Sequence, residues 1–304
     1  MSWGFIGVVS IFMIRDLYKV LFGLITVLTL LVIVSYQSSF KGNFIEHVSL
    51  CCFSVFSNLR QPIFKDIIPV MLLYFVFWVV LHEKLSHLKI QELTRNKKDV
   101  FRDFVFTFIN IVNLSTLGVI TNVIAGRYSL IYRDIHEYGY FYAVLSFCVL
   151  LLTADAYYYW LHRLLHHKKL FRHLHRLHHL THTPHPWTTF AMSPIEQLLI
   201  WCYYLAFICI VPLQTTVLFI FIIFHSVRQV LGHLGYEIFP KSAASGWLSW
   251  STTITHHDMH HKHVHCNYGL YFTFWDKLLD TNHPDYKTAF LKFSSKKDKK
   301  LEPI

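Results

Sequence analysis

Runs of apolar residues long enough to cross a lipid bilayer constrain this chain more than any other feature. A transmembrane helix needs about 20 apolar residues, or somewhat fewer if its flanking side chains reach the interface. Only 15% of the residues are charged, whereas a soluble domain has about a quarter. We therefore expect an all-α integral membrane protein with a bundle of about four to six transmembrane helices. The apolar runs are residues 17–36, 67–81, 104–124, 138–161 and 195–225.

The last run is interrupted at Pro212. A hairpin that turns near residues 212–214 would divide it into two arms of about 15 residues, each spanning about 22 Å at the helical rise. A shallow or re-entrant hairpin is the alternative. The first fourteen residues are also apolar, but Arg15, Asp16 and Lys19 end that stretch, and no small-residue cleavage site follows residues 17–36. We interpret that segment as an uncleaved anchor.

Basic residues gather before the third run and after the fourth. Because positively charged loops tend to stay in the cytosol, both loops and the N-terminus are expected there. The net charge of +10 does not indicate nucleic-acid binding, since no basic domain is separable from the apolar runs. These residues are Lys84, Lys89, Arg95, Lys97, Lys98 and Arg102, and then Arg163, Lys168, Lys169, Arg172 and Arg176.

Histidine is the unusual residue of this chain. Fifteen of its 22 histidines fall within residues 162–185 and 256–265. His162 and His166 lie one helical turn apart, so their imidazoles can point at one ion. Asp155 falls on the same helical stripe, near the end of an apolar run, where an ionisable group is costly and usually has a partner. We expect its carboxylate to accept the N–H of a ligand imidazole, although a helix-end charge bound to water or arginine is the alternative.

Two histidine triplets follow, each with spacing i, i+3 and i+4. They are His175, His178 and His179, and then His257, His260 and His261. With the earlier pair they supply eight ligands, which is too many for one tetrahedral zinc and suits two metals. Imidazole binds iron, zinc, copper and nickel, so the ligand type alone does not identify the metal. The six cysteines show no CxxC pairing, so a disulfide scaffold or cysteine–zinc site is not expected.

Other histidines near the triplets are expected to support the site or lie on the surface. His256 competes for the register of the last triplet, because it pairs with His260 at i+4. His233, between the hairpin and the last triplet, is a candidate ninth ligand. The supporting or surface histidines are His167, His173, His182, His185, His263 and His265.

The chain resembles the membrane-bound fatty acid hydroxylase/sterol desaturase superfamily, in particular the branch of sterol C-5 desaturases and C-4 methylsterol oxidases. It departs from the pattern of many members at residues 193–196, which read Ser-Pro-Ile-Glu instead of His-Pro-Leu-Glu, and at 280–281, which read Asp-Thr instead of Gly-Thr. The N-terminal half resembles nothing specific beyond membrane spans. The resemblance rests on residues 160–166, 175–179, 184–187, 233–237, 257–261 and 267–276.

The resemblance implies a di-iron site held by the histidine boxes, with His233 matching the family's extra histidine. It also implies dioxygen as co-substrate, electrons from a cytochrome b5-type or ferredoxin-type donor, and a lipid substrate that is hydroxylated or desaturated. Walls of the substrate site are expected at Trp187, Phe190, Tyr271 and Phe274. For any one of these aromatic side chains, packing in the core or a place in the interface belt is the favoured alternative.

From these observations we expect three regions. They are an N-terminal transmembrane region at 1–137, a catalytic domain at 138–285, and a basic cytosolic tail at 286–304. The lysine-rich part of the tail, from Lys292 onward, is expected to be solvated and to have no role in folding. The active site should face the cytosol, at the endoplasmic reticulum of a eukaryote or the inner membrane of a bacterium; residues 301–304 form no retention tetrapeptide.

The alternative function is a histidine-rich membrane protein that binds or transports zinc. A transport pathway would place ionisable ligands near the middle of the membrane, whereas the histidines here follow the apolar runs. A zinc hydrolase is not expected, because the HExxH motif is absent from the sequence.

Overall fold

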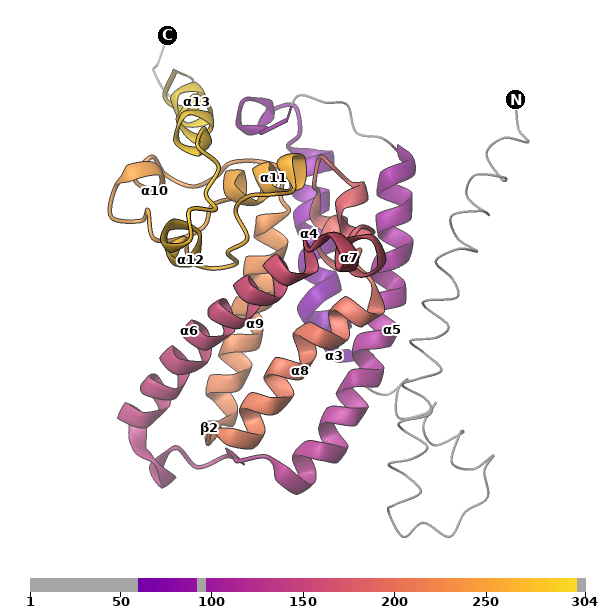
Figure 1. Ribbon diagram of the computed structural model, residues 1–304, viewed down its shortest axis with the longest axis vertical. Coiled ribbons are helices and arrows are strands. Elements are labelled where there is room, and N and C mark those ends of the chain that lie inside the picture. The colour runs from indigo at the N-terminus through magenta and orange to yellow at the C-terminus, as the bar shows by residue number, and fades with distance from the viewer. Residues whose placement is uncertain (1–59, 92–96, 300–304) are drawn as a thin grey trace, which may run out of the picture.

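Apolar helices form a bundle with a smaller histidine-rich cap at one end (Figure 1). The computed structural model describes residues 60–91 and 97–299. The expected anchor at 17–36 therefore lies outside the described residues. Four segments are long and apolar enough to cross a membrane, namely Ile63–Val80, α5 (Lys97–Tyr128), α6 (Gly139–Leu165) and α9 (Thr215–Gly232), and α8 (Pro194–Ile210) is apolar but shorter.

These helices confirm the predicted membrane architecture, with small shifts at their ends. The segment Ile63–Val80 follows α3 (Arg60–Pro62) and contains α4 (Ile68–Leu73) between two π-helical pieces, η1 (Ile63–Ile67) and η2 (Tyr74–Val80). A π turn contains more residues than an α turn, so it changes which side chains of the segment face the bundle. The break predicted at Pro212 is also found, since α8 ends at Ile210 and α9 begins at Thr215.

One short strand pair departs from a purely helical fold. β1 (Ile131–Tyr132) pairs in parallel with β2 (Leu213–Gln214). β1 belongs to the α5–α6 connection and β2 to the α8–α9 turn, so the two connections meet at the end of the bundle opposite the cap. Buried backbone groups need hydrogen-bond partners, and the two turns supply them to each other.

The histidine segments all lie at the cap end of the bundle. α6 and α9 end there, whereas β2 lies at the opposite end (Figure 1). The chain between the histidine segments 162–185 and 256–265 therefore runs away from the cap along α8 and returns along α9, which is the even number of passages that a shared site requires. The short elements of the structure are η3 (Ser86–Leu88), η4 (Ile135–Glu137), α7 (Lys168–Leu170), η5 (Phe171–His175), η6 (His178–Leu180), η7 (Pro186–Phe190), α10 (Ser242–Ser245), α11 (Ile254–His263), α12 (Phe274–Leu278) and α13 (Tyr286–Lys299).

Apolar side chains fill the bundle and also cover its outside. Leu150, Phe207, Leu213 and Phe221 form a buried cluster between α6, α8 and α9. On the outer face, large apolar side chains are exposed, including Phe141 at 82%. Soluble proteins rarely expose so much apolar surface, and lipid tails cover it in a membrane.

The start of α13 packs against the cap. The Tyr286 ring stacks on His256 with 3.5 Å between centroids, and Phe290 is fully buried. These contacts precede Lys292, so the predicted lack of a folding role from Lys292 onward stays a prediction.

Candidate metal centre

The nine histidines proposed from the sequence converge into two adjacent groups. In each group, the nitrogens that could bind an ion all lie within 4.8 Å of one another. The groups touch, since the rings of His179 and His261 stack 4.8 Å apart. We call them the five-histidine group, made of His162, His166, His175, His179 and His260, and the four-histidine group, made of His178, His233, His257 and His261.

Each triplet is divided between the two groups in the same way. His175 and His179 belong to one group and His178 to the other, while His257 and His261 share a group that excludes His260. On a helix, residues i and i+4 are about 40° apart, whereas i+3 and i+4 are about 100° apart. In α11, His257 and His261 therefore point the same way, and His260 points at the neighbouring group.

His233 enters the four-histidine group from the end of α9. Its Nδ1 lies 2.8 Å from the carbonyl oxygen of Gln229, and its Nε2 lies 2.9 Å from Nε2 of His257. The chain then turns at Gly235, which has φ 76°. A Cβ atom there would lie 2.9 Å from the carbonyl oxygen of Pro184, so the turn requires glycine.

The hydrogen bonds of these rings leave lone pairs facing one another. Nδ1 of His162 lies 3.0 Å from the Tyr268 carbonyl oxygen, and Nδ1 of His260 lies 2.6 Å from that of Cys266. A carbonyl oxygen only accepts, so each Nδ1 carries the proton and each Nε2 keeps a lone pair. Nε2 of His162 nevertheless lies 3.2 Å from Nε2 of His175. A cation between such atoms removes the repulsion.

Protonation does not provide that cation. Burial lowers the pKa of His261 well below its usual value, and neighbouring imidazoles lower it further. Burial likewise lowers the pKa of His166 to about 2. The Nε2 atom of His261 is buried without a hydrogen-bond partner among the described residues. Neutral rings with free lone pairs are the form that binds a metal.

The spacing of the nitrogens also fits metal ions. A metal–nitrogen distance of about 2.1 Å places ligand atoms about 3.0 Å apart at right angles and about 4.2 Å apart when opposite. In the five-histidine group, Nε2 of His179 lies 3.0 Å from that of His175 and 3.1 Å from that of His260. A six-coordinate ion in the five-histidine group would keep one position open, and one in the four-histidine group would keep two. The donor set therefore fits two metals, and their binding stays a prediction.

The structure corrects the prediction for Asp155. Its Oδ1 accepts the backbone N–H groups of Tyr271 and Phe272 at 2.8 and 3.1 Å, and not an imidazole N–H. The prediction is wrong because the loop after Asn267 folds back onto α6, and its backbone N–H groups take the place of an imidazole at this carboxylate. Asp155 instead holds the loop whose Tyr268 carbonyl orients His162.

Glu196 has the role that the sequence analysis gave to Asp155. Its Oε1 lies 2.7 Å from Nδ1 of His175, and both side chains are buried. The helix α8 begins at Pro194, capped by Ser193, whose hydroxyl accepts the Glu196 N–H. The signal was a carboxylate inside an apolar run, which requires a partner.

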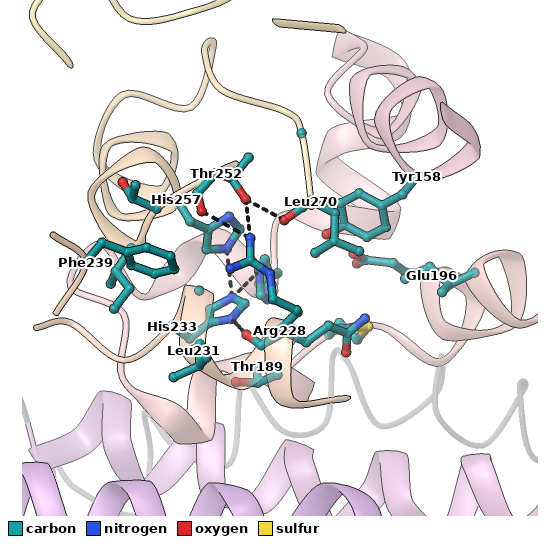
Figure 2. Close-up of a pocket in the computed structure, with 18 residues that line it drawn as sticks. Tyr158, Thr189, Glu196, Arg228, Leu231, His233, Phe239, Thr252, His257 and Leu270 are labelled. Atoms are coloured by element: carbon teal, nitrogen blue, oxygen red, sulfur yellow. Dashed lines mark hydrogen bonds between the residues drawn. The ribbon is translucent and has the colours of Figure 1, made fainter. Parts of the chain in front are cut away.

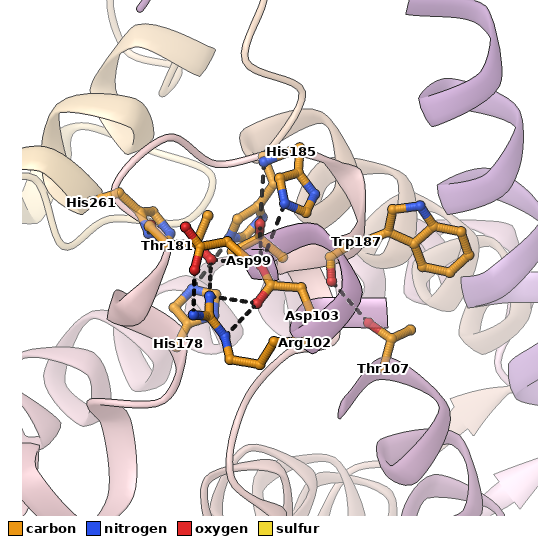
Figure 3. Close-up of polar contacts among 11 residues, drawn as sticks. Asp99, Arg102, Asp103, Thr107, His178, Thr181, His185, Trp187 and His261 are labelled. Atoms are coloured by element: carbon orange, nitrogen blue, oxygen red, sulfur yellow. Dashed lines mark hydrogen bonds and ion pairs between the residues drawn. The ribbon is translucent and has the colours of Figure 1, made fainter. Parts of the chain in front are cut away.

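A second group missed by the sequence analysis is centred on Asp103 of α5 (Figure 3). Its Oδ2 accepts the hydroxyls of Thr181 and Thr188 at 2.7 and 2.9 Å. Arg102 donates to its Oδ1 at 2.8 Å. The Thr181 carbonyl oxygen in turn lies 3.0 Å from Nδ1 of His261. Asp103 thus fixes the segment that orients a histidine of the four-histidine group.

His256 does not join either group. Its Nδ1 accepts the Thr253 N–H at 3.1 Å, in a reciprocal cap at the start of α11. The register with His257, His260 and His261 is therefore the one in which the imidazoles converge. Of the neighbours expected to be supporting or surface groups, His185 places Nε2 3.5 Å from Asp103, and His167, His173, His182, His263 and His265 are exposed.

A small cavity borders the four-histidine group. His178, His233 and His257 line it together with Thr189, Glu196 and Arg228 (Figure 2). A larger cavity of about 210 Å³ lies deeper in the bundle. Of the aromatic residues expected at the substrate, Phe190 lines the larger cavity. Trp187, Tyr271 and Phe274 line neither of these two cavities.

Those three aromatic residues have other environments. Trp187 packs against Phe104 with 4.9 Å between ring centroids. The Tyr271 hydroxyl hydrogen-bonds Nδ1 of His225. Phe274 is exposed at 58%. Their positions in the sequence identified aromatic character but not the direction of the side chain.

Comparison with known proteins gives a consistent result. The family model described as Fatty acid hydroxylase matches residues 147–281, which include all nine histidines. The chain is 31% identical over 172 residues to a Delta(7)-sterol 5(6)-desaturase of Gibberella zeae, covering 56% of this chain and 51% of that protein. It is 32% identical over 185 residues to lathosterol oxidase of Homo sapiens, covering 60% of each.

A more distant relative is methylsterol monooxygenase 1 of Rattus norvegicus, with 28% identity over 131 residues, or 43% of this chain and 44% of that protein. The chain thus spans about half to three fifths of the length of the curated relatives it matches. No solved structure matches it.

Proposed function

Residues 147–281 match the family model described as Fatty acid hydroxylase, and from this premise we propose that the chain belongs to that family and is a membrane-bound lipid oxidoreductase. It uses dioxygen and two external electrons to hydroxylate or desaturate a lipid of sterol or fatty acyl type. The observation that carries the proposal is the convergence of nine buried or half-buried histidines into two adjacent groups at one end of an apolar bundle. Zinc transport is not supported, because the family and its relatives are oxidoreductases.

The nine histidines would hold two iron ions, which supply the dioxygen activation needed to break an unactivated C–H bond. In a hydroxylation, one dioxygen, two electrons and two protons give an alcohol and one water. In a desaturation, the same reactants remove two hydrogens and give a double bond and two waters. Both outcomes use one ligand set, so the choice depends on where the lipid lies.

The protein contributes orientation and exclusion of water. Glu196 and the carbonyl oxygens of Tyr268, Thr181 and Cys266 each hold the Nδ1 side of a ring, which directs Nε2 toward the ion. The four-histidine group has the fewer ligands and borders the cavity. The reacting carbon of the lipid would therefore approach that group.

The electrons would come from a cytochrome b5-type or ferredoxin-type protein at the cap. Exposed Lys168, Lys169, Arg172 and Arg176 lie at this end and would attract an acidic partner. The same charges support a cytosolic site, at the endoplasmic reticulum of a eukaryote or the inner membrane of a bacterium. The catalytic domain would comprise residues 138–285, after the transmembrane region at 1–137.

The test is anaerobic purification followed by measurement of iron per chain and of dioxygen-dependent changes in the host's lipids by mass spectrometry. We expect about two irons and a new hydroxyl group or double bond. Removal of the metal with a chelator should abolish the product, and added Fe(II) should restore it. Stoichiometric zinc with no lipid product would instead favour the alternative.

A further inference from the structure

Large apolar side chains are exposed on the cap as well as on the helices that could cross a membrane. Trp247, which follows α10, is 76% exposed. Others lie on α12 and at the cap end of α6, and α10 and α12 occupy the part of the cap on the α6 side of the bundle (Figure 1). We call this surface the cap patch, and its exposed side chains are Trp160, Leu164, Trp247, Trp250, Phe274 and Leu278.

The cap patch continues the outer apolar side of α6. The exposed apolar side chains of α6 run from Phe141 to Leu164, which is about 34 Å at the helical rise. The hydrocarbon core of a bilayer is about 30 Å thick, so Trp160 and Leu164 reach the boundary between lipid tails and headgroups. The Trp275 ring of α12 packs on that of Trp160 with 6.0 Å between centroids. The helix α12 therefore lies at the level of that boundary.

Hydrogen bonds hold the two cap segments of the patch together. The carbonyl oxygen of Trp250 accepts the Thr273 N–H at 2.8 Å. The carbonyl oxygen of Ser249 accepts the Thr273 hydroxyl at 2.9 Å and Nζ of Lys277 at 2.8 Å. Asp155 of α6 holds the same segment through the Phe272 N–H. The aromatic side chains are therefore exposed on a fixed surface that is attached to α6.

The charges of the cap patch suit a lipid surface. Among residues 238–250 and 272–278, the exposed charged side chains are Lys241 and Lys277. The acidic residue of these segments, Asp276, is buried and accepts the N–H groups of Tyr268 and Gly269. Tryptophan is enriched at membrane interfaces, and lysine is attracted to anionic headgroups. Exposed tryptophans beside lysines are thus the composition of an interfacial segment.

We propose that the cap patch lies in the membrane interface, so that the α10–α12 part of the cap is a peripheral anchor added to the spans. The occupant of this surface is the bilayer itself, with lipid tails against the aromatic rings and headgroups beside the lysines. Thr252 and Leu270 line the smaller cavity beside the four-histidine group, and each lies two residues from an aromatic residue of these segments. The anchor therefore holds that wall of the cavity close to the membrane surface.

The first experiment maps lipid contact without turnover. The full chain is placed in nanodiscs of phosphatidylcholine and phosphatidylserine in equal parts, and some of the phosphatidylcholine carries a photoreactive diazirine near its headgroup. Mass spectrometry then locates the label. We expect label on residues 247–250 and 274–278 and on the end of α6, but not on the exposed side of α13, which lies farther from the spans (Figure 1). Label on α6 without label on the two cap segments would overturn the proposal.

The second experiment uses a matched pair of charge substitutions. Trp247→Glu places a carboxylate in the cap patch, and Thr288→Glu places one at an exposed position of α13. In Trp247→Glu, labelling of residues 274–278 should fall toward the level of α13, with unchanged iron content as evidence of folding. Thr288→Glu should label like the parent. Leu278→Glu repeats the test from α12, with residues 247–250 as the readout. Parent-like labelling in both patch variants contradicts the proposal.

A third measurement distinguishes the bilayer from a protein that covers the same surface. Lysine-reactive cross-linking is carried out on a mixture of isotope-labelled and unlabelled chains in the same nanodiscs. The proposal expects no cross-links from Lys277 to a second copy or to residues 1–59. An unlabelled cap patch together with such cross-links would show that protein covers it. None of these readouts requires turnover, so the anchor and the proposed reaction can fail separately.

Discussion

Single residues set the direction of five of the nine imidazoles, by contacts to Nδ1 of His162, His175, His233, His260 and His261. Most of these contacts are backbone carbonyl oxygens, such as Thr181 for His261. Glu196 is the exception, because a side-chain carboxylate holds His175. A carboxylate makes the bound imidazole a stronger ligand than a carbonyl does. His175 is therefore expected to depend on its partner more than the other rings.

Glu196→Gln should weaken metal binding while the helix bundle stays intact. The amide retains the shape of the side chain but loses the charge beside His175. Loss of such a partner lowers metal affinity roughly 10- to 100-fold. The measurement is titration of metal-depleted protein with Co(II), followed by its visible absorption. Glu83→Gln is the matched control, since that carboxylate is 90% exposed. An affinity equal to that of the control would contradict the assignment.

His256→Ala and His260→Ala should separate stability from metal binding. His256 caps α11 and stacks on Tyr286, so its loss should cost about 1 kcal/mol of stability and leave the iron content unchanged. His260 belongs to the five-histidine group, and its loss should remove iron and activity while the protein still inserts. Iron per chain and thermal unfolding are measured on both. If His256→Ala lost iron and His260→Ala kept it, His256 would be a ligand and the assigned register would be wrong.

Among the elements, α5 contributes to the site although it precedes the family segment at 147–281. Its carboxylate Asp103 accepts hydroxyl groups from Thr181 and Thr188, on both sides of the turn after the first triplet. The α5 helix also forms one wall of the larger cavity. The N-terminal half therefore shapes the site as well as anchoring the chain.

Asp103→Asn should loosen the four-histidine group. The amide nitrogen cannot accept a hydrogen bond, so at least one donor among Thr181, Thr188 and Arg102 loses its partner. We expect metal affinity to fall about tenfold, the lower end of the range for lost supporting groups. Co(II) absorption reports the coordination itself. The control is Asp99→Asn on the same helix, whose carboxylate is 33% exposed and contacts Arg102. Identical spectra and affinities in the two variants would exclude this role.

At the level of the whole molecule, one end of the bundle carries the histidines and most of the positive charge. Lys97, Lys98 and Arg102 begin α5 at that end, and Lys168 and Lys169 follow α6. The opposite end carries only a few basic residues in the described connections. This asymmetry predicts a single orientation in the membrane.

Lys168→Cys and Arg133→Cys should label from opposite sides of a sealed membrane. Both positions are exposed and lie on connections at opposite ends of the bundle. A membrane-impermeant maleimide added from the cytosolic side should modify only the first variant until the membrane is permeabilised. The parent protein, with its own cysteines, gives the background. Modification of Arg133→Cys from the cytosol before permeabilisation would invert the topology.

The membrane class, the described spans, the break at Pro212 and the set of converging histidines could all be predicted from the sequence. Each depends on neighbours along the chain, through the length of an apolar run or the repeat of a helix. Spacing alone left two registers open for the last triplet, because His256 pairs with His260 at i+4. In the folded chain, His256 belongs to the cap of α11 and to neither histidine group. Contact with Thr253 and Tyr286 removes that ambiguity.

The division of each triplet between two groups, the exchange of Asp155 for Glu196, and the role of Asp103 required the folded molecule. These features join residues far apart in sequence, such as Asp103 and Thr181, which are 78 positions apart, or His179 and His260, which are 81 apart. A local pattern shows that a buried carboxylate needs a partner. Only the packing of helices brings a particular partner within reach.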